Sequence, residues 1–419
     1  MTIFTLFWGC VLIIAFINKD IIKMISVTLI SMLFQATNMI DIGESGIGPQ
    51  VVASLLFIIK YLWWTKGKIR IIKSGEIQVI DLLFVLFVII IVISSYANGV
   101  LERNSILIIK LFIYLCCYLC MRGTLGNIDA TKIYNMMRPI IIFSITIGII
   151  QWIVTNYIPF FRPIMKVLFY NDSSLNVYFN YNDSYHNRRI YSTFMEPSYF
   201  SCLLVGAFYY LLSFKSEYKK NIVLLCVILI EILLTTSSTA YLAFVIAGIL
   251  FVIYSKQMKL KYKIIIIFIS IMSLLILYFG FYNLLDKVIF SKSSSGSGVT
   301  RTRWNLEALE AFYSSPIIGV GYKNIRGSSI ICSILGEVGL SGLICYVLII
   351  FACTRKFFKK NKYKNVSDDY YGVMLAVLTS VICQIVACPD FDLCTFWFWM
   401  YALGIYEGLY VNNFLRRRL

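Results

Sequence analysis

Runs of about 20 mostly apolar residues, separated by short polar segments, recur along the whole chain and restrict its fold more than any other feature. A helix needs about 20 apolar residues, with a usual range of about 17–25, to cross a bilayer. About 13 segments meet this pattern, and because several of them are short we expect about 12–14 spans. Their approximate cores are 2–17, 21–40, 51–65, 80–97, 105–121, 138–156, 195–214, 221–235, 240–254, 264–283, 331–353, 370–388 and 394–412. The first run is closely followed by the second, so we interpret it as a retained span rather than a cleaved signal peptide.

The composition makes the membrane the simplest solvent for this chain. Hydrophobic residues make up 59% of it and charged residues 14%, whereas soluble domains hold about 45–50% apolar and about 25% charged residues. Backbone groups in lipid must be hydrogen-bonded within their own segment, so the spans are predicted to be helices. The alternating pattern of about ten residues that is typical of a membrane barrel is absent. The sequence therefore predicts an all-α, polytopic transmembrane helical bundle.

The formal net charge of +17 comes mostly from Lys and Arg in short loops between the apolar runs. Every second loop is basic, namely residues 66–79, 215–220, 255–263 and 354–369, together with the C-terminal Arg416, Arg417 and Arg418. The intervening loops 41–50, 235–240 and 389–393 contain no Lys or Arg. Cytoplasmic loops carry the excess of basic residues, so we expect a multi-pass protein of the cytoplasmic (inner) membrane with its N-terminus outside and its C-terminus in the cytoplasm. This origin of the charge argues against a nucleic-acid partner.

Two predicted outer loops are longer than the rest, residues 157–190 and 284–330. They divide the chain into N-terminal spans over 1–156, central spans over 191–283 and C-terminal spans over 331–419. Both loops carry basic residues on the side of the membrane where such residues are disfavoured. Long loops in compact proteins are usually functional, so we look for a site there.

The first long loop is rich in Tyr, Asn, Asp and Ser. Amide and carboxylate groups hydrogen-bond to sugar hydroxyls, and flat rings pack on the apolar faces of sugars. Tyr185, Tyr191 and Tyr199 are therefore candidate sugar-binding residues. Because this chain favours Asn and Tyr throughout, a purely compositional origin of the pattern stays open.

Two arginines close this loop just before a predicted helix. Arg188 and Arg189 are followed by T-F-M-E-P-S-Y-F from Thr193, and Pro197 suits the first turn of a helix. The free N–H groups of a first turn favour an anion, and guanidinium groups match the oxygens of a phosphate. The pair is a candidate diphosphate site, with interfacial anchoring beside an ordinary helix start as the alternative.

The second long loop begins with the flexible stretch K-S-S-S-G-S-G at Lys292. Trp304, Ala308 and Phe312 then recur at helical spacing, which predicts an amphipathic helix near the membrane surface. The turn-rich stretch S-P-I-I-G-V-G-Y follows from Ser315. Four basic residues on the outer side require a partner, either lipid headgroups or a lipid-linked diphosphate: Arg301, Arg303, Lys323 and Arg326.

Other ionisable residues are assigned structural roles. Lys60 and Lys110 lie near span ends and are expected to snorkel. Glu231 differs from these: a carboxylate inside a span is a functional candidate by default, with a position near the interface as the equally weighted alternative. Asp390 and Asp392 form a D-F-D pair, a pattern that can bind a metal with a nucleotide sugar, but the pair is predicted outside the cell, where nucleotide sugars are absent. With one His in the chain and 12 Cys that lie mostly inside apolar runs, we predict neither a metal site nor a cofactor.

The order of these features resembles the superfamily of O-antigen polymerases and O-antigen ligases, which are multi-span membrane proteins with two large outer loops. Three stretches carry the resemblance: R-R-I-Y-S-T-F-M-E-P-S-Y-F from Arg188, R-W-N-L-E-A-L-E-A-F-Y-S-S-P-I-I-G-V-G-Y from Arg303, and S-S-I-I-C-S-I-L-G-E-V-G-L-S-G from Ser328. All three lie within residues 188–342, a segment of about a third of the chain. The resemblance implies a bundle with two large outer loops in a GT-C-like arrangement.

One departure from the superfamily favours its polymerase branch. Ligases typically carry a His-Asn pair about nine residues before the Glu of an E-x-G-l-x-G stretch. That Glu corresponds to Glu337, and the paired positions are Ser328 and Ser329. The single histidine, His186, lies in the other long loop.

The resemblance then implies glycosyl transfer at the outer face of the cytoplasmic membrane, without a metal or cofactor. A growing chain of O-antigen, capsule or exopolysaccharide on undecaprenyl diphosphate is moved onto the next lipid-linked unit. Glu196 is the expected base for the attacking hydroxyl, and Glu337 is the second candidate. The diphosphate would be held by Arg188, Arg189, Arg301, Arg303, Lys323 and Arg326. Expected partners are the lipid-linked oligosaccharide, the bilayer and a polysaccharide chain-length regulator. A ligase, a flippase or other transporter, and a membrane scaffold remain the alternatives.

Overall fold

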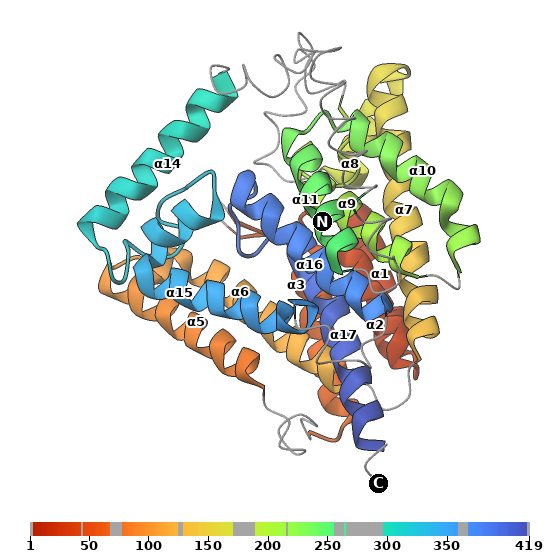
Figure 1. The fold of residues 1–419 in the computed structure, drawn as a ribbon, viewed down its shortest axis with the longest axis horizontal. Coiled ribbons are helices and arrows are strands. Elements are labelled where there is room, and N and C mark those ends of the chain that lie inside the picture. The colour runs from red at the N-terminus through yellow and green to blue at the C-terminus, as the bar shows by residue number, and fades with distance from the viewer. Residues whose placement is uncertain are drawn as a thin grey trace.

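Helices make up most of the structure (Figure 1). The computed structural model describes residues 3–42, 45–67, 78–124, 129–170, 189–214, 217–254, 264, 296–358 and 368–416. Within them, five helices are long and apolar enough to cross a membrane: α5 (Val79–Ala97), α6 (Leu101–Gly123), α7 (Ala130–Asn156), α15 (Ile330–Phe358) and α16 (Asp368–Val386). The expectation of an all-α polytopic membrane protein is confirmed.

Seven further helices overlap the other predicted span cores in the described residues, although α2 ends at Ser31 and leaves the second half of the predicted core 21–40 outside a helix. They are α1 (Ile3–Ile17), α2 (Ile21–Ser31), α3 (Pro49–Trp64), α9 (Pro197–Ser213), α10 (Tyr218–Leu234), α11 (Ser238–Tyr254) and α17 (Cys394–Arg416). Both α3 and α9 begin with a proline in the first turn, after a residue in extended conformation. The predicted span 264–283 lies outside the described residues except for residue 264.

The predicted long loops contain helices of their own. The 3-10 helix η1 (Pro159–Phe161) and helix α8 (Arg162–Phe169) occupy the start of the first loop, and α14 (Gly296–Ser314) forms the predicted helix of the second. A short antiparallel hairpin, β1 (Ile40–Ile42) with β2 (Ser45–Ile47), pairs Asp41 with Gly46 between α2 and α3.

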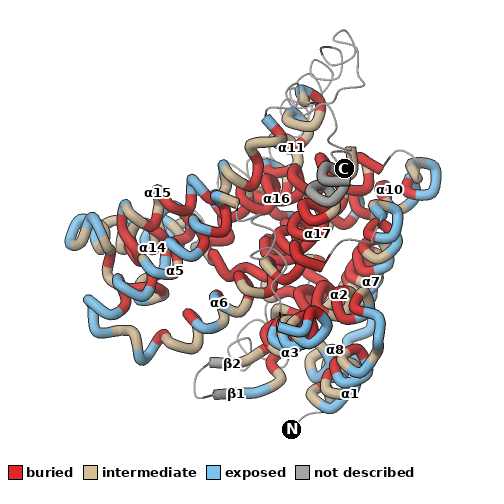
Figure 2. Tube along the Cα trace, turned by 90° about the horizontal axis from the view of Figure 1, so that it is seen from below, coloured by how far each residue is buried: buried red, intermediate tan, exposed pale blue. Residues whose placement is uncertain are grey.

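The central and peripheral helices differ in burial (Figure 2). In α16, 78% of the apolar stretch is buried inside the protein, whereas in α5 the share is 39%. The outward face of α5 is a continuous apolar stripe of exposed side chains: Leu82, Val85, Leu86, Ile89 and Ile93. Such a stripe is expected of a helix whose outer face contacts lipid. Helix α14 lies beside α15 (Figure 1), and a Cβ on Gly336 of α15 would come within 2.8 Å of the Ala308 carbonyl oxygen.

A kink in α15 joins two of the sequence stretches noted above. Gly339 has φ 69° and ψ −165° inside the helix, a backbone conformation almost restricted to glycine. The preceding loop, residues 315–329, supplies the missing hydrogen bonds. The Leu340 amide donates to the Pro316 carbonyl at 2.8 Å, and the Gly321 amide donates to the Glu337 carbonyl at 2.9 Å. Irregular backbone is tolerated at membrane depth when protein buries it in this way.

Candidate functional site

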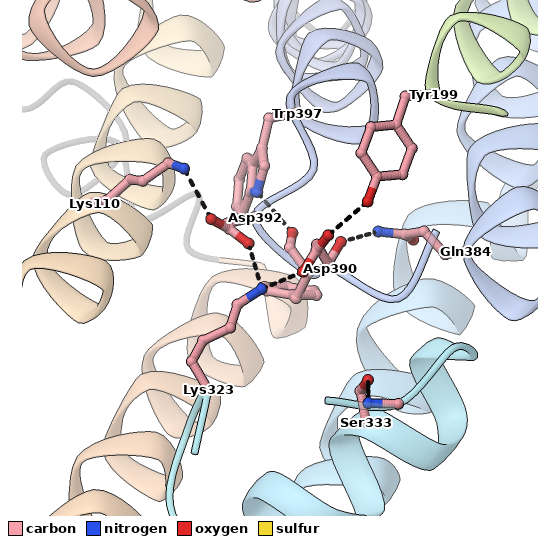
Figure 3. A network of polar contacts seen from close by, with 10 residues as sticks. Lys110, Tyr199, Lys323, Ser333, Gln384, Asp390, Asp392 and Trp397 are labelled. Carbon is pink, nitrogen blue, oxygen red and sulfur yellow. Dashed lines mark hydrogen bonds and ion pairs between the residues drawn. The ribbon is translucent and has the colours of Figure 1, made fainter. Parts of the chain in front are cut away.

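Five polar side chains from segments far apart in the sequence meet in one network (Figure 3). The Lys110 ammonium of α6 lies 2.9 Å from Asp392 Oδ2, and the Lys323 ammonium of the 315–329 loop lies 3.1 Å from Asp392 Oδ1. Lys323 also pairs with Asp390 Oδ1, while the Tyr199 hydroxyl of α9 donates to Asp390 Oδ2 at 3.0 Å. We call these five residues the ion-pair network.

The loop that carries the two aspartates of the network is fixed by hydrogen bonds from side chains to its backbone. They lie in the loop of residues 387–393, between α16 and α17. The Gln384 amide donates to the Asp390 carbonyl at 2.8 Å, and the Trp397 indole donates to the Phe391 carbonyl at 3.0 Å. The Phe391 ring packs edge-on against Phe87 with centroids 4.7 Å apart. The loop therefore presents both carboxylates from a fixed position.

The charges of the network stabilise one another. Burial disfavours the ionised form of Asp392, but Lys110 and Lys323 outweigh it and hold the pKa of that carboxyl below its usual value. Burial likewise disfavours the Lys323 ammonium, but Asp390 and Asp392 outweigh it and raise the pKa of the lysine well above its usual value. Two cations and two anions thus coexist in a partly buried site.

Lys323 is positioned by an unusual turn. Its own φ is 57°, and Gly319 and Gly321 before it also have positive φ. A Cβ on Gly319 would lie 2.4 Å from the Glu337 backbone, so glycine is required for this close approach. The Tyr322 carbonyl accepts a hydrogen bond from Asn104 at 2.7 Å, which ties the turn to the start of α6.

The two predicted catalytic glutamates lie near the ion-pair network. Glu337 is buried, and it is close enough to Lys323 to interact with it electrostatically. Glu196 occupies the N-cap position of α9, where its Oε2 accepts a hydrogen bond from the Ser198 hydroxyl at 3.1 Å. Glu196 lies close enough to Tyr199 to interact with it electrostatically.

Arg326 is the exposed cation of the 315–329 loop. Its guanidinium lies over the Trp304 ring of α14 at 4.4 Å from the centroid, and it is close enough to Tyr199 to interact electrostatically. Among the described residues no carboxylate forms an ion pair with it. The stack leaves the edge of the guanidinium, where its N–H donors lie, open to an anion.

Other predicted residues have partners away from the ion-pair network. The Arg189 guanidinium donates to the Thr235 carbonyl at 2.8 Å, where it caps the C-terminal end of α10. Tyr191 packs against Tyr170, with ring centroids 5.5 Å apart. Arg303 pairs with Glu307 on the exposed face of α14. Arg301 is half-buried on the same helix. The predicted site residues Arg188 and Tyr185 lie outside the described residues.

The structure gives Lys110 a partner that the sequence did not indicate. Its ammonium, on α6, pairs with Asp392 of the 387–393 loop. Asp390 and Asp392 were considered only as metal ligands, yet their carboxylates contact ammonium groups. In the part of the chain that the structure describes, no group of three His, Cys, Asp or Glu side chains is arranged to hold a metal ion. Glu231 is buried, and its carboxylate has no hydrogen-bond partner among the described residues.

The fold defines the class of the protein first: a mostly helical membrane protein with several apolar helices long enough to cross a membrane and a network of polar side chains between them. The sequence comparison then shows a similarity to one family over part of the chain. Residues 222–330 match the family model described as O-antigen ligase, which supports membership of the O-antigen ligase and polymerase superfamily. The match covers α10, α11, α14 and the 315–329 loop, about a quarter of the chain. No curated protein matches the chain.

Proposed function

We propose that this protein polymerises lipid-linked oligosaccharide repeat units. It would transfer the growing chain from undecaprenyl diphosphate to the next lipid-linked unit at the outer membrane face. The observation that carries the proposal is the meeting of the three family-like sequence stretches at one network of polar side chains. Tyr199 belongs to the first stretch, Lys323 directly follows the second, and Glu337 belongs to the third. All three lie in or beside the ion-pair network.

This transfer has two chemical requirements: stabilisation of the leaving diphosphate and removal of a proton from the attacking hydroxyl. Negative charge builds on the leaving diphosphate, and fixed cations stabilise it without a metal. In this proposal Arg326 and Lys323 of the 315–329 loop would fill that role, whereas Arg189, Arg301 and Arg303 would need to act from outside the ion-pair network. The attacking sugar hydroxyl must also lose a proton, and the site offers three carboxylates for this step: Glu196, Glu337 and Asp390.

The alternative function is that of a ligase, which moves a finished polysaccharide to a lipid or other acceptor. The description of the matching family favours it. Ser328 and Ser329 oppose it, because they stand where ligases of the superfamily typically carry a His-Asn pair. The amides of both serines donate to the Asn305 side-chain oxygen, at 2.8 and 3.2 Å, so this position fixes α14 to the start of α15.

The products of a deletion strain distinguish these two functions. If the protein is a polymerase, the strain is expected to hold single repeat units on lipid and on the final acceptor, because unit synthesis continues while polymerisation stops. Gel separation of the lipid-linked and acceptor-linked material measures this outcome. Long lipid-linked chains that never reach the acceptor would instead identify a ligase, and normal long chains on the acceptor would exclude both.

Arg326 offers a sharper test of diphosphate binding. Arg326→Ala and Arg326→Lys are both expected to reduce chain formation by roughly one to two powers of ten, since a charge-assisted hydrogen bond contributes about 1.5–3 kcal/mol. Lysine fails because an ammonium provides neither the two-pronged contact nor the flat stack on Trp304. Polymer ladders from a complemented deletion strain, normalised to protein in the membrane, give the measurement.

The matched control for this test is Arg138→Lys. Arg138 donates to the Asn221 side chain at 3.2 Å and takes no part in the candidate site, so its ladder is expected to equal that of the wild type. Full activity of Arg326→Lys would show that Arg326 only anchors the loop at the interface, because a lysine anchors as well as an arginine.

A further inference from the structure

The Lys323 ammonium is shared by two carboxylates in different surroundings. The Asp392 side chain is 10% exposed and also contacts Lys110, whereas the Asp390 side chain is 32% exposed and, among the described residues, forms an ion pair with Lys323 alone. If an anion from outside enters the site, it can therefore displace Asp390 from Lys323 more easily than it can displace Asp392. The buried aspartate keeps Lys323 in position during the exchange.

Asp390 remains oriented when Lys323 is exchanged. Tyr199 donates to Oδ2 at 3.0 Å, so that oxygen stays fixed, while Oδ1 is the oxygen that loses the ammonium. The Gln384 amide, itself hydrogen-bonded to the Tyr346 hydroxyl at 3.1 Å, holds the backbone carbonyl of the same residue. A reacting group needs this kind of support from neighbours that do not themselves react.

The other two carboxylates lack this combination. Glu337 is 5% exposed, and the 315–329 loop is hydrogen-bonded to its backbone, so it is less accessible to a sugar hydroxyl than Asp390. Glu196 has the neutral Ser198 hydroxyl as its hydrogen-bond partner, and among the described residues no cation pairs with it. A diphosphate that binds Lys323 would therefore take a cation away from Asp390 but none from Glu196.

We propose that the Lys323–Asp390 pair is the reacting centre: Lys323 exchanges Asp390 for the donor diphosphate, and the released Asp390 takes the proton of the acceptor hydroxyl. This inference rests on the proposed function and names the base for it. The acceptor O–H bond breaks and its proton passes to Asp390 Oδ1. The acceptor oxygen bonds to the anomeric carbon, the bond from that carbon to the phosphate oxygen breaks, and its electron pair leaves with the lipid diphosphate. Asp390 then loses the proton to water.

The exchange couples donor binding to acceptor activation. A diphosphate carries more negative charge than one carboxylate, so it competes effectively for the ammonium. An ammonium in contact with a carboxylate weakens that carboxylate as a base, and its removal restores the basicity. Donor binding to Lys323 therefore frees Asp390 Oδ1 to take the proton of the acceptor hydroxyl.

Asp390→Asn tests the proposal directly. The substitution keeps the shape of the side chain and is expected to reduce chain elongation by roughly 100- to 10,000-fold, the usual contribution of a general base. The assay uses membrane vesicles and the lipid-linked units extracted from the deletion strain, with rates normalised to the amount of protein. Glu217→Gln is the matched control, because Glu217 pairs with the exposed Lys220 away from the site, and its rate is expected to equal that of the wild type.

The double variant Lys323→Gln/Asp390→Asn distinguishes a catalytic from a structural role of the pair. It removes both charges and leaves none unpaired. If the pair only holds the two loops together, the double variant should regain activity, whereas it should stay inactive if the pair is the reacting centre. Recovery to within about threefold of the wild-type rate in the double variant, or in Asp390→Asn alone, overturns the inference. If Asp390→Asn fails to reach the membrane, the double variant alone decides by the same criterion. Failure of the proposed function looks different, because the deletion strain would then hold no unpolymerised units to assay.

Discussion

Gly339→Ala is expected to prevent the protein from accumulating in the membrane. The backbone at this position has φ 69° and ψ −165°, which an alanine adopts only at a cost of about 1–3 kcal/mol. A Cβ would also lie 2.4 Å from the carbonyl carbon and oxygen of Ile317. Backbone cannot move aside as a flexible side chain does, so the 315–329 loop would lose its pairing with α15. We expect a total destabilisation of more than about 4 kcal/mol, in the range reserved for disrupted cores and special backbone positions.

Alanine substitutions at two other glycines distinguish the cost of backbone strain from the cost of the steric clash. Gly99 has a similar φ of 67° but nothing within 4 Å of an added Cβ, so Gly99→Ala measures left-handed strain alone, about 1–2 kcal/mol. Gly9 lies in helix α1 with open space around it, so Gly9→Ala is expected to be neutral or slightly stabilising. Membrane level and the apparent unfolding temperature in detergent rank the three variants. If Gly339→Ala resembles Gly99→Ala, the close backbone pairing at the kink does not exist.

The helices could be predicted from the sequence because lipid imposes a simple rule on each segment separately. Leu101–Gly123 and Pro197–Ser213 follow from apolar length, and Pro197 marks its helix start without any knowledge of neighbours. Gly339 shows where the rule ends. Its place in an apolar run predicts a continuous helix, and only the contact with Ile317, from a different element, explains the kink.

The candidate site was predictable in part for the same reason. Tyr199, Lys323 and Glu337 were found because each lies in or beside a stretch with recognisable local order. The pairing of Lys110 with Asp392 joins residues 282 positions apart, and no pattern in a single sequence indicates such a distant partner. A usable signal did exist: a lysine inside an apolar run needs an anion or a route to water, and the D-F-D loop supplies two carboxylates.

Asp392→Ala is expected to destabilise the protein by about 3–5 kcal/mol, the usual effect of removing one partner from a buried ion pair. Lys110 loses the acid that contacts it, and Lys323 keeps Asp390 alone. The charge balance of two cations and two anions is broken. Glu217→Ala is the control at an exposed pair, whose loss is expected to cost less than about 1 kcal/mol.

The pH dependence of this effect follows from the directions of the two pKa shifts. The pKa of Asp392 is lowered in the folded protein, so its stabilisation is present above the unfolded value of about 3.9 and is lost only in stronger acid. The pKa of Lys323 is raised, so its stabilisation is fully present below about 10.4 and is lost only in stronger base. The penalty of Asp392→Ala should therefore be the same at about pH 6 and about pH 8.

Restoring the charge balance should recover most of the lost stability. In Lys110→Met/Asp392→Asn, one cation and one anion are removed together, and Lys323 retains Asp390 as its partner. This double variant is expected to unfold at a higher temperature than Asp392→Asn alone, because no lysine remains buried without an acid. If the double variant is the less stable of the two, Lys110 and Asp392 do not depend on each other. Substitution of Asp392 should therefore lower mainly the stability of the protein, whereas substitution of Asp390 should lower mainly the rate of chain elongation.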